Sequence, residues 1–260
     1  MKILVTGARG TVGSAVAEQA RVAGHDVVAW DRERAAPDDA DACAHLLAEV
    51  KPDALFHLAV PSRGTGRADE GRLVNVDWSE RLSRLAAAAN IRYLFTSTVM
   101  VFTDHAPGPF TIDSEPDAKD GYGGEKREAE QRVRAANPDA VIARLGWQIG
   151  HAPGSNNMID HLERQMREQG EIRASTRWLP ACSFVDDTAD ALLRLSGMAG
   201  DLYLLSANER WNYFEIVSAL NTLHGGRWKV TPTEDFTYDQ RMLDPRPGLP
   251  PLATRLPGLA

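Results

Sequence analysis

The sequence has 260 residues, of which 43% are hydrophobic and 25% charged, and a formal net charge of -7 at pH 7. This length suits one large α/β domain, or a major domain with a minor one, and allows an ample buried core. The negative charge and the lack of a basic cluster argue against nucleic acid or an acidic membrane surface as a partner. The net charge does not exclude small acidic molecules as substrates, because a pocket can be basic inside an acidic protein.

The sequence also lacks the marks of export, membrane insertion and metal binding. It opens directly on a strand pattern, without the charged and apolar regions of a secretory signal. No apolar run approaches the ~20 residues that span a bilayer. Cys43 and Cys182 stand far apart, which predicts neither a disulfide framework nor a zinc site, and no histidine has metal-ligand spacing. We therefore expect a cytoplasmic protein without a metal centre.

The first 31 residues predict the opening βαβ unit of a dinucleotide-binding domain. The segments are an apolar strand at 2–6, a glycine-rich turn at 7–13, a helix to about residue 22, and a second strand at 27–30 that leads into Asp31. Gly7 would allow a tight turn, Gly10 a close approach of a pyrophosphate, and Gly13 close packing of the helix on the sheet. The phosphates would then lie on the N–H groups at the start of the helix.

Strand and helix patterns continue to alternate as far as residue 145. They predict a helix at 42–50, a strand at 54–60, a long helix at 69–90, a strand at 93–96, a loop at 103–120, a helix at 122–136 and a strand at 140–145. This alternation indicates an α/β protein with a Rossmann-type, doubly wound parallel sheet.

Beyond residue 146 the alternation is less regular. Helices are expected at 158–169, 187–196 and 213–224, a strand at 202–205, and an extended proline-rich tail from 244. We expect an NAD(P)-binding Rossmann domain at 1–150, which also uses 180–205. A small C-terminal substrate-binding subdomain at 151–260 would be interleaved with it.

Three side chains are candidates for catalysis. Tyr122 and Lys126 stand four residues apart at the start of a helix, and therefore share one face. A lysine ammonium beside a phenol lowers the pKa of the tyrosine, which could then exchange a proton with a carbonyl or an alcohol. Thr98 follows a buried strand, at the edge where open α/β sheets bind ligands. The alternatives are a surface Tyr–Lys pair and a hydroxyl that merely forms a turn.

These stretches, in this order, resemble those of a known enzyme family. The further matching segments are Lys51-Pro52-Asp53, Asn75-Val76, Val101-Phe102, Arg144 with Trp147, Asn156-Asn157-Met158, Phe184-Val185-Asp186-Asp187 and Arg246-Pro247. The chain resembles an extended short-chain dehydrogenase/reductase of the dTDP-4-dehydrorhamnose reductase branch. The resemblance implies that Tyr122 is the general acid, that Lys126 supports it and binds the ribose, and that Thr98 polarises the substrate carbonyl.

The pattern and the resemblance together give two further sets of residues. The cofactor-binding set is Gly7, Arg9, Gly10, Thr11, Val12, Gly13, Asp31, Arg32, Asp38, Leu58, Ala59, Val60, Asn75 and Lys126. The substrate-binding set is Val99, Met100, Trp147, Asn157 and Arg246.

The chain departs from the family beside Thr98 and in its length. Val99-Met100 replaces the usual Asp-Tyr pair, which weakens the case for the usual deoxysugar. The chain is also shorter than family members, mostly near its C-terminus, so we expect a reduced substrate subdomain with a smaller or different ligand.

The signals for the type of nicotinamide cofactor conflict. Asp31 can accept hydrogen bonds from both adenosine ribose hydroxyls and repels a 2′-phosphate. Arg9 and Arg32 could instead hold that phosphate. We lean toward NAD(H), with use of both cofactors left open.

The leading hypothesis is an NAD(P)-dependent oxidoreductase acting on a small or nucleotide-linked, sugar-like substrate. The nicotinamide would supply a hydride and Tyr122 a proton. A nucleotide-sugar 4-epimerase that retains NAD, and a non-catalytic, cofactor-binding regulatory subunit, are kept as alternatives. The resemblance also leaves open a homodimer formed through the helices at 69–90 and 122–136.

Overall fold

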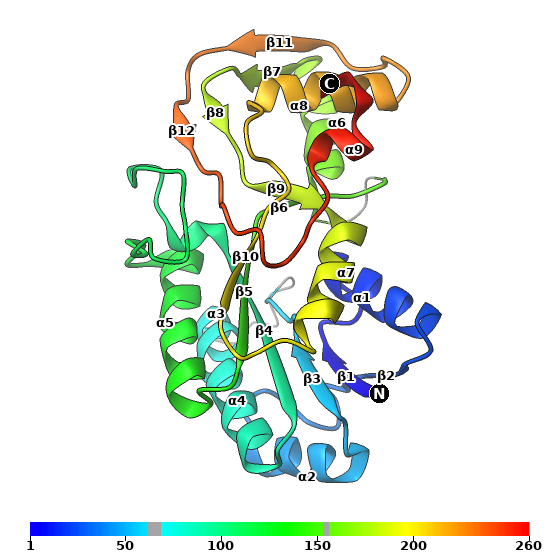
Figure 1. Ribbon diagram of the computed structural model, residues 1–260, viewed down its shortest axis with the longest axis vertical. Helices are drawn as coiled ribbons and strands as arrows, with labels where there is room; N and C mark the ends of the chain where they lie inside the picture. The colour runs from blue at the N-terminus through cyan, green and yellow to red at the C-terminus, as the bar shows by residue number, and fades with distance from the viewer. Residues whose placement is uncertain (62–68, 153–155, 260) are drawn as a thin grey trace.

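A computed structural model describes residues 1–61, 69–152 and 156–259. Figure 1 shows two parts, a six-stranded sheet flanked by helices and a smaller group of helices and short strands beyond one end of that sheet. No helix of the described residues combines the length and the apolar character needed to cross a membrane.

The predicted doubly wound parallel sheet is confirmed. Every neighbouring pair in the sheet is parallel, and the strand order is β10-β5-β4-β3-β1-β2. The strands are β1 (Lys2–Thr6), β2 (Asp26–Ala29), β3 (Ala54–His57), β4 (Arg92–Thr98), β5 (Val141–Leu145) and β10 (Leu202–Leu205). The strand order reverses at β1, since β2 lies on one side of it and β3 on the other. Ligands of such sheets bind at this reversal, outside the carboxyl ends of the strands.

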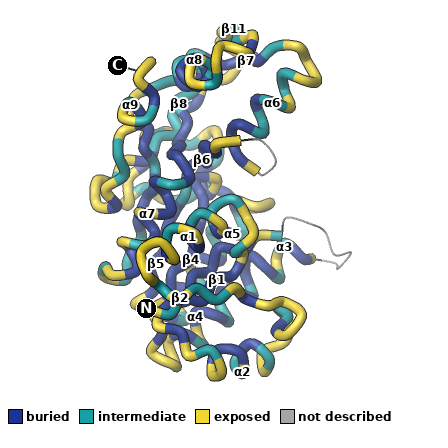
Figure 2. The backbone as a smooth tube through the Cα atoms, turned by 90° about the vertical axis from the view of Figure 1, so that its right-hand side faces the viewer, coloured by how far each residue is buried: buried dark blue, intermediate teal, exposed yellow. Residues whose placement is uncertain are grey.

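Helices cover both faces of the sheet because successive strand residues point to opposite sides. Ile3 and Val5 pack toward α1 (Thr11–Val22) and α7 (Val185–Leu195). The intervening Leu4 belongs to the core on the other face. That face is covered by α2 (Ala40–Val50), α4 (Trp78–Ala88) and α5 (Gly121–Ala136). In Figure 2 the central strands are buried, whereas the outer turns of the helices are exposed.

The helix predicted at 69–90 is interrupted. It consists of α3 (Glu70–Arg72), a π-helical turn at Leu73–Asp77 and then α4. Asn90 follows α4 with φ of 53°, a left-handed conformation that asparagine tolerates at the end of a helix. π-helical turns inside helices are frequent at functional sites, so the side chains of this turn are candidates for a functional role.

The smaller part has its own apolar core. Its helices are α6 (Met158–Gln169), α8 (Tyr213–Leu223), α9 (Leu252–Arg255) and a 3₁₀ turn at Pro257–Leu259. Its strand pairs are β7 (Ile172–Ser175) with β11 (Val230–Thr233), β8 (Trp178–Leu179) with β12 (Tyr238–Asp239), and β6 (Trp147–Ile149) with β9 (Cys182–Phe184). The expected extended tail is therefore partly helical, because Leu252 and Leu256 join the core of α6 and α8.

Candidate active site

The three glycines of the turn after β1 serve different purposes. Gly7 has φ of +68°, and a Cβ atom there would lie 2.8 Å from the carbonyl oxygen of Leu58. A Cβ on Gly13 would lie 2.1 Å from the carbonyl oxygen of Gly7. Both positions therefore require glycine whether or not a ligand is bound, because any side chain would overlap the backbone. A Cβ on Gly10 would have one close neighbour, the Gly7 oxygen at 3.3 Å, so its missing side chain leaves space that a ligand can use.

The N-terminus of α1 lies at this turn and suits an anion. Gly10 is the N-cap residue and supplies no side chain to cap the helix, and the first turn contains no acidic residue. The backbone N–H groups of Thr11, Val12 and Gly13 have no acceptor earlier in the helix. Together with the helix dipole, they match the pyrophosphate of a dinucleotide.

Asp31 and Arg32 follow β2 but face different surroundings. Asp31 is exposed, and its Oδ1 accepts a hydrogen bond of 2.9 Å from the backbone N–H of Glu33. The Arg32 guanidinium lies 5.8 Å from the ring centre of Trp78, and its Nη2 is 3.8 Å from Glu70 Oε1. Arg32 is thus directed toward the interrupted helix, while the Asp31 carboxylate faces solvent.

The remaining members of the cofactor set lie at two other places. Arg9 is exposed in the glycine turn. Asp38 is exposed just before α2, where the neighbouring Asp39 caps the helix by accepting from the N–H of Ala42 at 2.9 Å. Nothing in this local geometry sets Asp38 apart from the acidic run around it.

The segment after β3 is fixed beside the glycine turn. Thr6 Oγ1 accepts hydrogen bonds from the N–H groups of Leu58 at 3.1 Å and Ala59 at 3.2 Å. These N–H groups therefore bond a side chain, and β3 ends at His57 and not at Val60 as predicted. Leu58 and Ala59 are buried, whereas Val60 is exposed at this edge of the sheet.

Thr98 lies where predicted, at the carboxyl end of β4. Its Oγ1 accepts a hydrogen bond of 3.2 Å from the N–H of Met100, which starts a 3₁₀ turn at Val99–Val101. A Cβ atom on Gly123 would lie 2.0 Å from the carbonyl oxygen of Met100. The first turn of α5 therefore packs directly on the turn after Thr98. In this turn Val99 is buried, and Met100 is 53% exposed.

Lys126 is almost completely buried beneath this turn, with 1% of its surface exposed. Its Nζ donates a hydrogen bond of 3.0 Å to the carbonyl oxygen of Thr96 and lies 4.6 Å from the ring centre of Phe95. The same atom is 5.9 Å from the ring centre of Tyr122. Burial lowers the pKa of Lys126 to about 7, although the nearby carboxylates of Glu130 and Glu125 oppose this shift.

The expected lowering of the Tyr122 pKa is wrong for this structure. Tyr122 keeps 37% of its surface exposed. Desolvation of the phenol by the surrounding protein, and then the negative charge of Glu125, raise the pKa of Tyr122 to about 12. The Lys126 ammonium does not reverse this, since it is directed at the Thr96 carbonyl and is itself easily deprotonated. Tyr122 is consequently protonated at neutral pH, as a proton donor must be.

A buried ion pair holds α5 on the sheet one turn beyond Lys126. Arg144 of β5 donates from Nε to Glu130 Oε1 at 2.9 Å and from Nη2 to Oε2 at 2.7 Å. The guanidinium also lies 5.1 Å from the ring centre of Phe102. Arg144 is thus a structural partner of α5.

The predicted substrate residue Trp147 lies immediately beyond the carboxyl end of β5. It stacks at 6.0 Å on both Trp178 and Tyr213, and meets His161 edge to face at 5.3 Å. This half-buried aromatic group extends from the edge of the main sheet into the core of the smaller part.

The other two predicted substrate residues are engaged by the fold. Asn157 is buried and caps α6 by accepting from the N–H of Asp160 at 3.1 Å. Arg246 bonds Asp244, Asp201 Oδ2 at 2.8 Å and the carbonyl oxygen of Leu202 at 2.7 Å. Leu202 starts β10, so Arg246 lies at the end of the sheet opposite Thr98. Both side chains thus have structural roles, and contacts of Asn157 and Arg246 with substrate stay a prediction.

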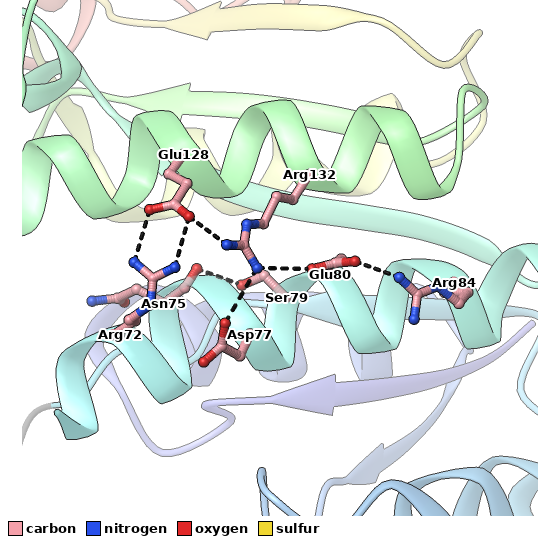
Figure 3. Close-up of polar contacts among 8 residues, drawn as sticks. All are labelled: Arg72, Asn75, Asp77, Ser79, Glu80, Arg84, Glu128 and Arg132. Atoms are coloured by element: carbon pink, nitrogen blue, oxygen red, sulfur yellow. Dashed lines mark hydrogen bonds and ion pairs between the residues drawn. The ribbon is translucent and has the colours of Figure 1, made fainter. Parts of the chain in front are cut away.

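The two helices considered for dimerisation pack on each other within one chain. Figure 3 shows the ion pairs across their exposed seam. Arg72 bonds both carboxylate oxygens of Glu128, at 2.9 and 2.8 Å. Arg132 bonds Glu80 at 3.1 Å and Asp77 at 3.4 Å. The charges of this seam are therefore matched within the chain, and the homodimer stays a prediction.

The described residues contain no group of three or more His, Cys, Asp or Glu side chains arranged to hold a metal ion. The groups gathered at the sheet edge are the glycine turn with its helix N-terminus, and the trio of Thr98, Tyr122 and Lys126.

Comparison with known proteins places this arrangement in a family. Residues 1–244 match the family model described as RmlD substrate binding domain. The spore coat polysaccharide biosynthesis protein SpsK of Bacillus subtilis is 24% identical over 257 residues, 98% of this chain and 89% of the relative. The dTDP-4-dehydrorhamnose reductase of Mycolicibacterium smegmatis is 28% identical over 198 residues, 75% of this chain and 60% of the relative.

A solved structure shows the same fold. The crystal structure of a dTDP-4-dehydrorhamnose reductase from Clostridium acetobutylicum superposes with a TM-score of 0.80 at 22% identity, and the match covers 95% of this chain and 91% of that one. The chain belongs to the RmlD substrate-binding-domain family, the dTDP-4-dehydrorhamnose reductase-like branch of the extended short-chain dehydrogenases/reductases.

Proposed function

We propose that this protein is an NAD(P)H-dependent reductase of a carbonyl group in a small or nucleotide-linked, sugar-like substrate. The observation that carries the proposal is the packing of α5 on the turn after Thr98. It brings Tyr122 and the buried Lys126 to the sheet edge that also holds the glycine turn. Curated relatives named dTDP-4-dehydrorhamnose reductase support this reaction class.

The glycine turn supports a dinucleotide as the cofactor. The N–H groups at the start of α1 would hold its pyrophosphate, in the space left by Gly10. A structural neighbour from Bacillus anthracis, with a TM-score of 0.80, was solved in complex with NADP, and one from Bordetella bronchiseptica in complex with NAD+. For this chain we favour NAD(H), because the Asp31 carboxylate is exposed after β2 and Arg32 is engaged by Glu70 and Trp78.

The side chains at the edge divide the remaining work. When bound, the nicotinamide supplies the hydride. Tyr122 is protonated at neutral pH and donates a proton to the substrate oxygen. Thr98 accepts from the N–H of Met100, so its own hydroxyl hydrogen is available to orient the same oxygen. Lys126, held by the Thr96 carbonyl, places its donors beneath Tyr122.

The apolar turn after Thr98 indicates a less polar substrate than the usual deoxysugar. Met100 exposes 53% of its surface beside the catalytic threonine, where the family usually has a tyrosine. The substrate group that lies there is expected to make an apolar contact and not a hydrogen bond.

The proposal is tested with Tyr122→Phe, which removes the phenolic hydroxyl alone. We expect nearly unchanged affinity for the cofactor and a fall in turnover of about a hundredfold or more, as for loss of a general acid. Tyr203→Phe is the matched control, since its hydroxyl bonds the Ala199 carbonyl far from the site. Wild-type turnover by Tyr122→Phe would refute the assignment.

Two outcomes would favour the alternatives. A tightly held, oxidised cofactor in the purified protein would indicate a 4-epimerase. Cofactor binding without any turnover would favour a regulatory subunit. Another relative, 26% identical over 238 residues, is named as an enzyme subunit, methionine adenosyltransferase 2 subunit beta of Xenopus tropicalis.

A further inference from the structure

A buried chain of hydrogen bonds runs from β1 to the π-helical turn. Thr6 Oγ1 accepts two backbone N–H groups, so its single hydroxyl hydrogen points to His57 Nδ1 at 2.8 Å. The Nε2–H of His57 then donates to Ser79 Oγ at 3.0 Å, and the Ser79 hydroxyl donates to the carbonyl oxygen of Asn75 at 2.8 Å. Figure 3 shows this last bond. Burial, and next the charge of Lys126, keep the pKa of His57 well below its ordinary value. His57 is therefore neutral, with one ring nitrogen that accepts and one that donates, and each hydrogen bond from Thr6 to Asn75 has a fixed direction.

The end of this chain holds the carboxylate of Glu125. Asn75 is 1% exposed, and its Nδ2 donates to Glu125 Oε2 at 2.7 Å. A carboxylate only accepts, which requires this orientation of the amide. On the other side, a Cβ atom on Gly71 would lie 2.8 Å from Glu125 Oε1. The carboxylate is therefore lodged against α3 and the π-helical turn, in space that any larger residue at Gly71 would fill.

Glu125 stands between Tyr122 and Lys126 on α5, and its negative charge acts on both. It raises the pKa of Tyr122, after the larger effect of burial, and it partly offsets the lowering of the pKa of Lys126 by burial. The other charged or titratable groups around this cluster are Glu130 of α5, Arg144 of β5, which bonds Glu130, His57 of β3 and Arg72 of α3. Arg72 is bonded to Glu128, and Glu130 to Arg144. Glu130 still opposes the lowering of the Lys126 pKa, and more strongly than Glu125 does.

We propose that Glu125 is a positioning residue for the reduction: the Asn75 amide and the space left by Gly71 hold its carboxylate on α5 beside Tyr122 and Lys126, where its negative charge acts on both side chains. This inference rests on the proposed function, since it concerns the same proton donor. It assigns the π-helical turn a purpose, namely to present the Asn75 amide to the catalytic helix.

The test is the pH dependence of Glu125→Gln, which keeps the shape and removes the charge. Loss of the carboxylate lowers the pKa of both Lys126 and Tyr122, so the alkaline limb of kcat/KM for reduction should move to lower pH by about one unit. Glu128→Gln, on the exposed seam of the same helix, is the matched control and should leave the limb in place. A uniform loss of activity with an unshifted limb, or an equal shift in the control, would overturn the proposal.

A second measurement separates this inference from the proposed function. NMR of protein labelled with ¹³C-lysine follows the ionisation of Lys126 without substrate, and Lys126→Met assigns the signal. The midpoint should be near 7 in the wild type and lower by about one unit in Glu125→Gln. An unchanged midpoint would overturn the role of Glu125, whether or not the protein is a reductase. Absence of turnover with a shifted midpoint would refute the reductase alone.

Discussion

Burial of Lys126 predicts an unusual pH dependence of stability. Its pKa falls from an ordinary 10.5 in the unfolded chain to about 7 in the folded protein. Between these values the unfolded chain binds more protons, so the free energy of unfolding rises with pH. Below about pH 7 both states hold the proton and this contribution is constant. The sign is thus that of a buried lysine whose ionised form is disfavoured by folding.

Replacement of Lys126 by methionine isolates the effect, because methionine fills a similar volume without a charge. One pKa unit corresponds to about 1.4 kcal/mol. From about pH 7.5 to about pH 9.5, the stability of the wild type relative to Lys126→Met should therefore rise by about 2 kcal/mol. Urea denaturation of both proteins at the two pH values measures this change. Subtracting the stability of Lys126→Met from that of the wild type removes the contribution of every group that titrates alike in both proteins. A difference that is flat, or that falls as pH rises, would refute the burial argument.

Substitutions at two places test the packing around the site. Gly13→Ala should destabilise the protein by about 3 kcal/mol because its Cβ overlaps the Gly7 carbonyl. Gly10→Ala should lower the stability by about 1 kcal/mol or less. Urea denaturation measures both, and equal losses of stability in the two variants would contradict this difference. Arg144→Leu should cost about 3 to 5 kcal/mol, because it leaves the Glu130 carboxylate buried and unpaired, and the double variant with Glu130→Leu should recover much of it. A double variant no more stable than Arg144→Leu would show that the loss comes from something other than the unpaired charge.

The sheet could be predicted from the sequence because its signals are local. Apolar runs at 2–6 and 54–57 and the helix pattern at 11–22 lie within single elements. The glycine turn adds a backbone requirement at Gly7 and Gly13, which the positive φ and the close contacts of the structure explain.

The features that sequence analysis missed depend on contacts between distant segments. β3 ends at His57 because the following N–H groups bond Thr6, some fifty positions earlier. The π-helical turn is likewise part of a network that reaches Asn75 from Thr6. The helical spacing of Tyr122 and Lys126 predicted their proximity, but the burial that sets their pKa values is a property of the whole fold.

Asn157 and Arg246 show a second limit. Both are residue types that bind ligands, and both lie in segments that resemble family motifs. In the structure Asn157 caps α6, and Arg246 bonds Asp244 and Asp201. A polar side chain that the fold already satisfies has the same sequence signature as one that awaits a ligand. The glutamate at 125 carried no signal, since nothing in its spacing linked it to Asn75.

Titration of the purified protein with NADH and with NADPH, followed by nicotinamide fluorescence, tests whether the glycine turn binds a dinucleotide. The structure predicts saturable binding with one dinucleotide per chain, tighter for NADH because of the exposed Asp31 carboxylate, and weakened in Gly10→Ala although that variant stays folded. Tighter binding of NADPH would reverse the preference but keep the site. Failure of both dinucleotides to bind the folded protein would contradict the account.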